Sequence, residues 1–152
     1  MVQSRNKTDR YRRTVNWVNK VVIGLQRIGI VFGPMQLLTV AGRRSGQPRT
    51  FPIAVMPLTG GRYLVQAYPK AAWVANARAA DTVTLTRGRR ATTARLVELS
   101  VEQRRPLLRE LVATAPPSVG KRFVTTELAE GATPDAVADA ADRIAMFRIE
   151  TV

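Results

Sequence analysis

Five short apolar segments follow one another between residues 36 and 99, and each is bounded by a glycine, a proline or a polar turn. Close succession of this kind is typical of antiparallel β-structure, because neighbouring antiparallel strands need only a few linking residues. At residues 59–61, Thr-Gly-Gly predicts a hairpin, since glycine tolerates the positive φ of tight turns. The expected strands are 36–41, 49–56, 62–67, 82–86 and 91–99. The pattern predicts a small barrel decorated by helices.

Helical signals lie before, between and after these strands. Ser100 and Gln103 have the spacing of a capping box, in which each side chain would cap the backbone N–H of the other residue. Thr133 followed by Pro134 marks another helix start, because proline is favoured at the first helical position. The expected helices are 14–32, 70–80, 101–115 and 134–140, and a last strand is expected at 144–149. We therefore expect one α+β domain over residues 14–152, behind a mobile basic tail at residues 1–13.

The turn between the first two expected strands combines two glycines, three arginines and two hydroxyl groups. Arginine binds phosphate and carboxylate groups bidentately, and glycine lets backbone N–H groups approach the same anion. The segment runs through Gly42, Arg43, Arg44, Ser45, Gly46, Gln47, Pro48, Arg49 and Thr50. It predicts a cradle for a phosphate or a carboxylate. A solvated hairpin with incidental arginines is the alternative, because charged tight turns are common.

A second candidate segment covers residues 67–78, after the third expected strand. Tyr68, at the end of that strand, is placed to stack on a planar ring or to hydrogen-bond to it. Lys70, Asn76 and Arg78 are candidates for polar contacts from the helix that follows. Trp73 is interpreted first as a core residue, since large aromatic side chains dominate core burial.

The net charge of +13 is unevenly distributed along the chain. Residues 10–95 contain fifteen basic residues and one acidic residue, whereas residues 96–152 contain seven basic and nine acidic residues. The charge of the first two-thirds of the chain therefore predicts a surface that binds an anion. Nucleic acid, an acidic membrane and a polyanionic cofactor are the possible partners. An uncommitted solubilising charge is the alternative, but it does not predict this asymmetry.

Cysteine and histidine are both absent from the 152 residues. Their absence excludes a disulfide framework, a thiolate nucleophile, an iron–sulfur cluster and a Ser-His-Asp triad. A transition-metal site built by the protein would have to use oxygen ligands alone, and we expect no metal site. If the chain is an enzyme, the difficult chemistry then belongs to a bound cofactor.

Several runs of residues resemble the deazaflavin-dependent nitroreductase and quinone reductase family. Residues 37–53 resemble its signature, in which a strand leads into a Gly-Arg-Lys/Arg-Ser/Thr-Gly turn, then Pro-Arg and a second strand. Residues 73–79 resemble its Trp-x-x-Asn-Leu-Arg-Ala helix. Further similar runs are 61–65, 84–90 and 146–149. Pro69 and Ala75 depart from a glycine and a histidine that many members carry nearby.

This resemblance implies an antiparallel split β-barrel, mainly β, with N-terminal and C-terminal helices, that binds coenzyme F420; FMN is the less expected cofactor. The basic turn would hold the phosphate and carboxylate tail, the strand after it would line the deazaflavin ring, and the segment from residue 67 would close over the ring. The cofactor-binding residues implied are Arg43, Arg44, Ser45, Gly46, Pro48, Arg49, Thr50, Pro52, Ile53, Ala54, Val55, Ala67, Tyr68, Lys70, Trp73, Asn76 and Arg78.

The implied activity is hydride transfer from reduced deazaflavin to a small organic acceptor, which is a quinone, an enone or a nitroaromatic compound. Such an enzyme needs to position the acceptor and stabilise the negative charge that develops on it. Tyr68 is the candidate catalytic residue, and Lys70 and Arg78 are alternative donors. A non-catalytic barrel that carries a cofactor or a lipid is a further alternative.

Two other partners follow from the charge. A nucleic-acid-binding barrel is an alternative, but aromatic residues make up only 6% of the chain and do not alternate with basic residues along a strand, as stacking platforms would. We expect no nucleic acid partner. The basic N-terminus and the helix at 14–32 could contact a membrane, or the helix could pack across the barrel. No secretory signal is recognisable, so we expect a cytoplasmic protein. The oligomeric state is left open.

Overall fold

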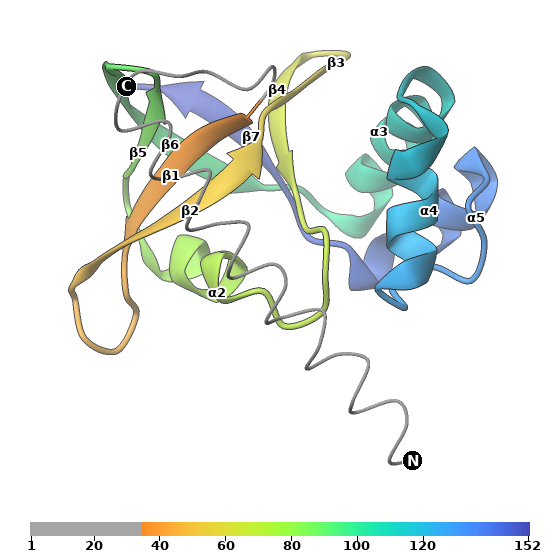
Figure 1. Ribbon diagram of the computed structural model, residues 1–152, viewed down its shortest axis with the longest axis horizontal. Coiled ribbons are helices and arrows are strands. Elements are labelled where there is room, and N and C mark those ends of the chain that lie inside the picture. The colour runs from red at the N-terminus through yellow and green to blue at the C-terminus, as the bar shows by residue number, and fades with distance from the viewer. Residues whose placement is uncertain (1–34) are drawn as a thin grey trace.

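The computed structural model describes residues 35–152 of the chain (Figure 1). The predicted basic tail at 1–13 and the predicted helix at 14–32, with its membrane contact, lie outside the described residues. The elements in chain order are β1 Met35–Ala41, β2 Pro48–Ala54, β3 Met56–Leu58, β4 Gly61–Val65, α2 Ala72–Ala79, β5 Val83–Arg87, β6 Arg90–Glu98, α3 Val101–Thr114, α4 Pro117–Thr125, α5 Pro134–Asp139, the 3₁₀ turn η1 Ala141–Arg143, and β7 Met146–Thr151. None of these helices combines the length and the apolar composition that crossing a bilayer needs.

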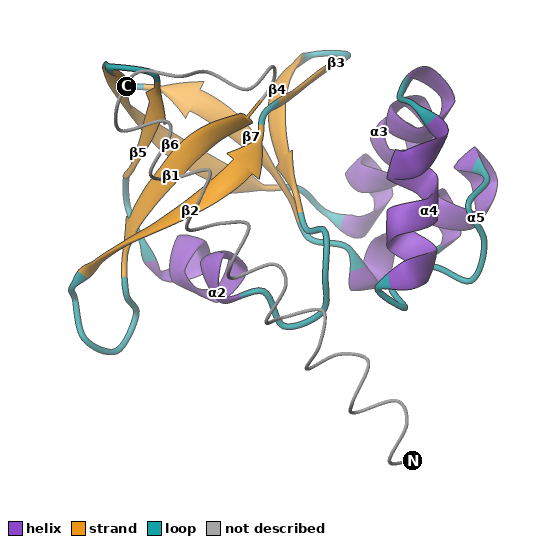
Figure 2. Ribbon diagram, in the orientation of Figure 1, coloured by secondary structure: helices purple, strands orange, loops and turns teal. Residues whose placement is uncertain are grey.

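The strands form one seven-stranded sheet in the order β2-β1-β5-β6-β7-β4-β3, and every pairing is antiparallel. Three pairs of consecutive strands form hairpins, β1 with β2, β3 with β4 and β5 with β6, and β7 joins the two halves by pairing between β6 and β4. Although β2 and β3 lie at opposite edges, only Val55 separates them in the chain. The sheet therefore curls round until its two edges approach each other (Figure 2). This architecture confirms the predicted antiparallel split barrel.

Alternation along the strands fills the inside of the curl with apolar side chains. Leu38 and Val40 of β1 alternate with Thr39, and Val83 and Leu85 of β5 alternate with threonines in the same way. The helix α2 lies below the strands in Figure 1 and contributes Trp73, Val74 and Ala77 to the same core. The ring of Trp73 meets that of Phe147 on β7, with centroids 5.6 Å apart. α2 therefore closes the lower end of the barrel.

A second apolar core joins the sheet to a layer of three helices. Tyr63 of β4 and Met146 of β7 face this layer, where they pack with Leu108 of α3, Phe123 of α4 and Val137 of α5. The α3 helix begins at the predicted capping box, with both hydrogen bonds between Ser100 and Gln103 formed. The helix α5 begins at the predicted Thr133 cap. Local capping signals therefore place both helix starts correctly.

Three details differ from the sequence prediction. The expected strand 49–56 is two strands, because the chain bends at Val55 to change edges of the sheet. The expected helix 70–80 begins only at Ala72, and Lys70 before it has a positive φ of 54°. The helix α4 was not predicted, because Pro116, Pro117 and Gly120 resemble helix breakers in sequence. Proline at the first helical position instead starts the helix.

Candidate functional site

The basic turn between β1 and β2 is held in one conformation by its own backbone. The Gly42 N–H donates to the carbonyl of Gln47 at 2.8 Å, and the Gly46 N–H donates to the carbonyl of Gly42 at 2.8 Å. Gly46 has φ +71°, and a Cβ built on Gly42 would lie 2.9 Å from Oγ of Ser45. Gly46 is therefore favoured by its dihedral angle, and at Gly42 a side chain would displace the Ser45 hydroxyl. The turn's own hydrogen bonds and glycine dihedral angle therefore define its shape.

A buried asparagine joins this turn to α2. Oδ1 of Asn76 accepts hydrogen bonds from the Arg43 backbone N–H at 3.2 Å and from Nη1 of the same arginine at 3.0 Å. Asn76 is only 2% exposed, although it is polar. Buried polar side chains are retained where they hold a specific partner. The two candidate segments, 42–50 and 67–78, thus meet through Arg43 and Asn76 at the lower end of the barrel (Figure 1).

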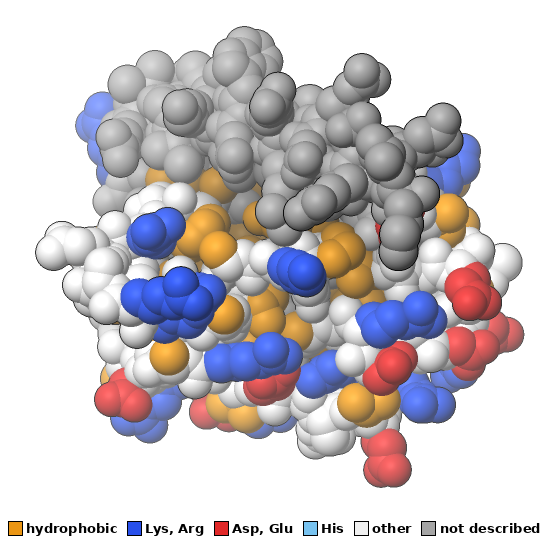
Figure 3. Space-filling model, turned by 90° about the horizontal axis from the view of Figure 1, so that it is seen from below, with side chains coloured by type: hydrophobic (Ala, Val, Ile, Leu, Met, Phe, Trp, Pro, Cys, Tyr) orange, Lys and Arg blue, Asp and Glu red, His pale blue; other side chains and the backbone are white. Residues whose placement is uncertain are grey.

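The positive charge around this junction has no compensating ion pair within residues 35–152. Arg44, Arg49 and Lys70 are exposed and form no ion pair with any residue of the described part. Among described basic residues before Leu96, only Arg78 has an acidic partner. In the view from below, basic side chains gather around a band of apolar ones (Figure 3). Positive charge beside apolar surface is an arrangement that could bind an anion carrying an apolar part.

Tyr68 lies in the loop between β4 and α2, which Gln66 fixes in place. The Gln66 backbone N–H donates to the carbonyl of Ala145, and its Oε1 accepts from the Ala145 N–H, both at 2.9 Å. Its Nε2 donates to the carbonyl of Tyr68 at 3.0 Å. The Tyr68 side chain packs partly against the barrel core. Sequence reasoning missed Gln66, whose only signal is a polar residue at the end of an apolar strand.

The predicted ring-lining residues 52–55, three at the end of β2 and Val55 just after it, lie on two faces. Ile53 and Val55 are buried in the barrel core, whereas Pro52 and Ala54 are half-buried on the outer face. Thr50 lies on that outer face too, with its Oγ1 3.1 Å from Oγ1 of Thr39. The register extends this pair into a row of threonines across four strands, which are Thr50, Thr39, Thr84 and Thr93.

The remaining candidates have the following places. Ser45 and Gly46 form the exposed tip of the turn, with Pro48 and Arg49 at the start of β2. Ala67 lies half-buried in the loop beside Tyr68. Trp73 is buried in the barrel core, as its first interpretation expected. Arg78 turns away from the basic turn to a carboxylate on β6.

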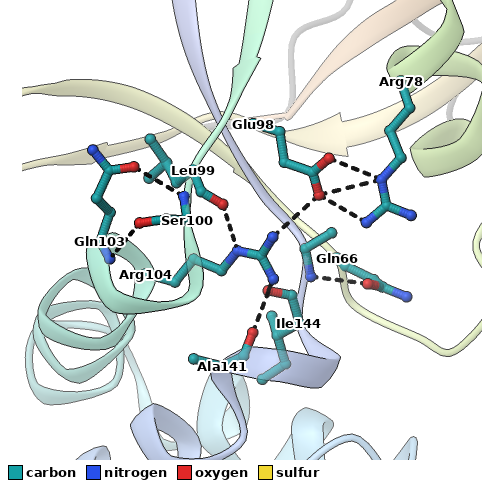
Figure 4. Close-up of polar contacts among 10 residues, drawn as sticks. Gln66, Arg78, Glu98, Leu99, Ser100, Gln103, Arg104, Ala141 and Ile144 are labelled. Atoms are coloured by element: carbon teal, nitrogen blue, oxygen red, sulfur yellow. Dashed lines mark hydrogen bonds and ion pairs between the residues drawn. The ribbon is translucent and has the colours of Figure 1, made fainter.

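This carboxylate, Glu98, is the centre of a polar network (Figure 4). Nε of Arg78 donates to its Oε1 at 2.9 Å, and Nη2 donates to its Oε2 at 2.7 Å. Arg104, which is 8% exposed, donates from Nη2 to the same Oε2 at 3.1 Å. The hydrogen bond from Arg78 holds the pKa of Glu98 below its usual value, against the opposing effect of partial burial. The same bond raises the pKa of Arg78.

The lowered pKa makes part of the stability depend on pH. Ionised Glu98 contributes stability that is fully present above its unfolded pKa, near 4.5, and is lost as pH falls through the lower folded-state value. We expect the free energy of unfolding to fall more steeply below about pH 5 in the wild type than in Glu98→Gln. Urea unfolding of both proteins at neutral and acidic pH measures this difference. If the free energy of unfolding changed with pH equally in the two proteins, the pair of Glu98 and Arg78 would contribute nothing to stability.

The donor set of the turn fits a ligand with phosphate and carboxylate groups. Guanidinium groups of Arg44 and Arg49 are exposed beside a backbone turn, and a Cβ built on Gly46 would have no atom within 4 Å. The tip is therefore open, and both charged forks and backbone can approach an anion from solvent. No described group of acidic side chains could hold a metal ion.

Comparison with solved structures supports the architecture. A chain described as a domain-swapped dimer superposes with a TM-score of 0.53 at 22% identity, covering 89% of this chain and 98% of the other. An F420-H2 dependent reductase gives 0.52 at 23% identity, covering 80% and 98%. A protein of unknown function from Agrobacterium tumefaciens gives 0.53 at 11% identity, covering 86% of this chain and 53% of the other. These similarities establish the shared fold.

The family of the chain is identified from its sequence. No curated protein matches the chain at a significant level. The family model described as F420H(2)-dependent quinone reductase matches residues 3–129, which is most of the chain and includes the basic turn, the Tyr68 loop and α2. The chain therefore belongs to the F420H2-dependent quinone reductase family.

Proposed function

We propose that this chain is an F420H2-dependent reductase that transfers a hydride to a small organic acceptor. The observation that carries the proposal is the junction between Arg43 and Asn76, which holds the turn while Arg44 and Arg49 stay exposed and have no acidic partner within residues 35–152. A polyanionic coenzyme tail is the ligand chemistry that such a turn suits. Membership of the family supports F420 as that coenzyme.

The residues of the turn would hold the coenzyme by its anionic tail. Arg44 and Arg49 would bind phosphate and carboxylate oxygens, and Ser45 would add a hydroxyl donor at the tip. Arg43 is already bonded to Asn76, so it would act mainly by keeping the turn in place. Pro52 and Ala54 would offer apolar contact to the ring on the outer face of β2. When bound, reduced F420 supplies the hydride from C5 of its deazaflavin.

The protein would then need to orient the acceptor and provide a proton. Tyr68 is the proposed donor, because its backbone is fixed by Gln66 and its phenol lies on the loop beside α2. A quinone that gains a hydride and one proton becomes a hydroquinone, so one donor is sufficient. Lys70 is exposed on the same loop and would stabilise negative charge on the acceptor. Quinones, enones and nitroaromatic compounds all accept a hydride in this way.

Anaerobic titration with F420, followed by deazaflavin fluorescence, tests the proposal. We expect saturable binding of F420 that FMN does not displace, because the turn offers several cationic groups to a tail that carries more negative charge than the phosphate of FMN. Oxidation of F420H2 by a panel of quinones and nitroaromatic compounds then identifies the acceptor class. Failure to bind F420, or preference for FMN, would overturn the proposed function and leave the fold unchanged.

A further inference from the structure

The short helix α2 is held by hydrogen bonds on two sides, one to the basic turn and one to β6. We propose that Glu98 and Arg78 are positioning residues for the anion-binding turn: they fix α2, and α2 fixes the turn through Asn76. The consequence for ligand affinity rests on the proposed function, whereas the mechanical link between β6 and the turn does not.

α2 needs external support because little within the helix fixes it. It has eight residues, and isolated helices of fewer than about 12 residues are marginal in water. Its N-cap is Ala71, which provides no side-chain hydrogen bond, and its first turn has no acidic residue. Trp73 and Val74 anchor it in the barrel core, but apolar packing is non-directional. Directional contacts therefore add to this packing in defining the rotation of α2.

Asn76 and Arg78 provide such contacts on different sides of the helix. Residues two apart do not share a helix face. Asn76 is directed to Arg43 in the turn, while Arg78 is directed to Glu98 at the end of β6. The pair with Glu98 uses two nitrogens of one guanidinium group on two carboxylate oxygens, and this geometry restricts orientation as well as distance. Rotation of α2 would disrupt both contacts together.

The carboxylate of Glu98 is itself fixed from the helical layer (Figure 4). Arg104 of α3 donates to it at 3.1 Å and also donates to the carbonyl of Leu99 at 2.9 Å and that of Ala141 at 3.0 Å. A continuous set of hydrogen bonds thus runs from α3 and η1 through β6 and α2 to Arg43. The helical layer is remote from the turn in sequence, yet this path connects it to the candidate site.

The direction in which Glu98→Gln changes the Kd for F420 distinguishes this inference from simple electrostatics. Glu98→Gln removes a negative charge, so long-range attraction alone predicts tighter binding of an anionic coenzyme. If Glu98 positions α2, the same substitution weakens binding. We expect the Kd for F420 to rise about 3- to 30-fold, the range seen when a network residue without ligand contact is changed. An unchanged or lower Kd in folded Glu98→Gln would overturn the inference.

Arg78→Met tests the positioning role from the other side of the ion pair. The Arg78 side chain is half exposed, and its loss leaves no buried charge unpaired, because Glu98 keeps its pair with Arg104. Arg95→Met is the matched control: it removes the same charge from β6, where Arg95 is exposed and has no described ion pair. We expect Arg78→Met to raise Kd more than Arg95→Met does. In an Asn76→Ala background Arg78→Met should change the Kd for F420 very little, since the contact between α2 and the turn is already lost. If the two substitutions changed the binding free energy additively, Arg78 would not act through Asn76.

Amide hydrogen exchange tests the link without any coenzyme. The Arg43 N–H donates to Asn76, so Arg78→Met should accelerate its exchange, while the Thr59 N–H, bonded to Glu110, should keep its rate. NMR measures both amides in one sample. Unchanged exchange at Arg43 would overturn the positioning role. If wild type fails to bind F420 while Arg43 exchange still responds, the proposed function fails and the link from β6 to the turn stands.

Discussion

Replacing Arg104 by methionine should lower the free energy of unfolding by about 1–3 kcal/mol, the cost typical of leaving buried hydrogen-bond acceptors without a donor. Methionine keeps much of the aliphatic volume but makes no hydrogen bond. The carbonyls of Leu99 and Ala141 then lose their charged donor, and Glu98 keeps only its bond to Arg78. Since buried polar groups without partners are costly, the loss falls mainly on the junction between sheet and helices.

Arg105→Met is the control for this substitution. Arg105 is the next residue of α3, is exposed, and forms no described ion pair, so its loss should change the free energy of unfolding by no more than about 0.5 kcal/mol. Urea unfolding, followed by circular dichroism, measures both variants against the wild type. A cost for Arg104→Met no greater than that for Arg105→Met would show that the network does not stabilise the fold.

The second large effect concerns ligand affinity. Arg43→Ala combined with Arg44→Ala should raise the Kd for F420 on the order of 100-fold, because net contributions of charge-assisted hydrogen bonds are about 1.5–3 kcal/mol each. Arg43 adds an indirect loss, since its guanidinium and backbone are what Asn76 holds. Fold stability should change little, because both side chains are exposed and the backbone N–H of residue 43 still donates to the buried Asn76.

A charge-matched control exists on another hairpin. Arg89→Ala with Arg90→Ala removes two exposed arginines from the turn between β5 and β6, far from α2 at the other end of the barrel (Figure 1). Only the long-range part of the attraction is lost there, so we expect a severalfold change at most, which shrinks as salt is added. Equal losses in the two double variants would mean that the basic turn is not the binding site.

The features that sequence predicts here are local ones. The Thr59 hairpin, the Ser100 capping box and the Thr133 cap each depend on residues within a few positions, and the structure confirms all three. The basic turn was identified as a candidate for the same reason, since Gly42 and Gly46 mark its bends. Its position against α2 could be expected only from the family resemblance, because Asn76 lies 33 residues from Arg43.

Contacts between distant residues could not be predicted. Arg104 and Ala141 are 37 residues apart, and Arg78 and Glu98 are 20 apart. In sequence, all three polar residues resemble ordinary surface charges, and only the packing of α3 on the sheet buries Arg104. Gln66 is a similar case, because its partner Ala145 lies 79 residues later. The residues that support the candidate site are thus harder to predict from the sequence than the residues that form it.

At Val55 the chain passes directly from one edge strand of the sheet to the other. In an ordinary open sheet, each edge strand can fray by itself, because the other edge is covalently remote. Here β2 and β3 are the two edges, and they are one continuous piece of chain. A displacement of β2 near Ala54 is therefore passed through a single residue to β3, whereas the basic turn, at the opposite end of β2, is remote from this link.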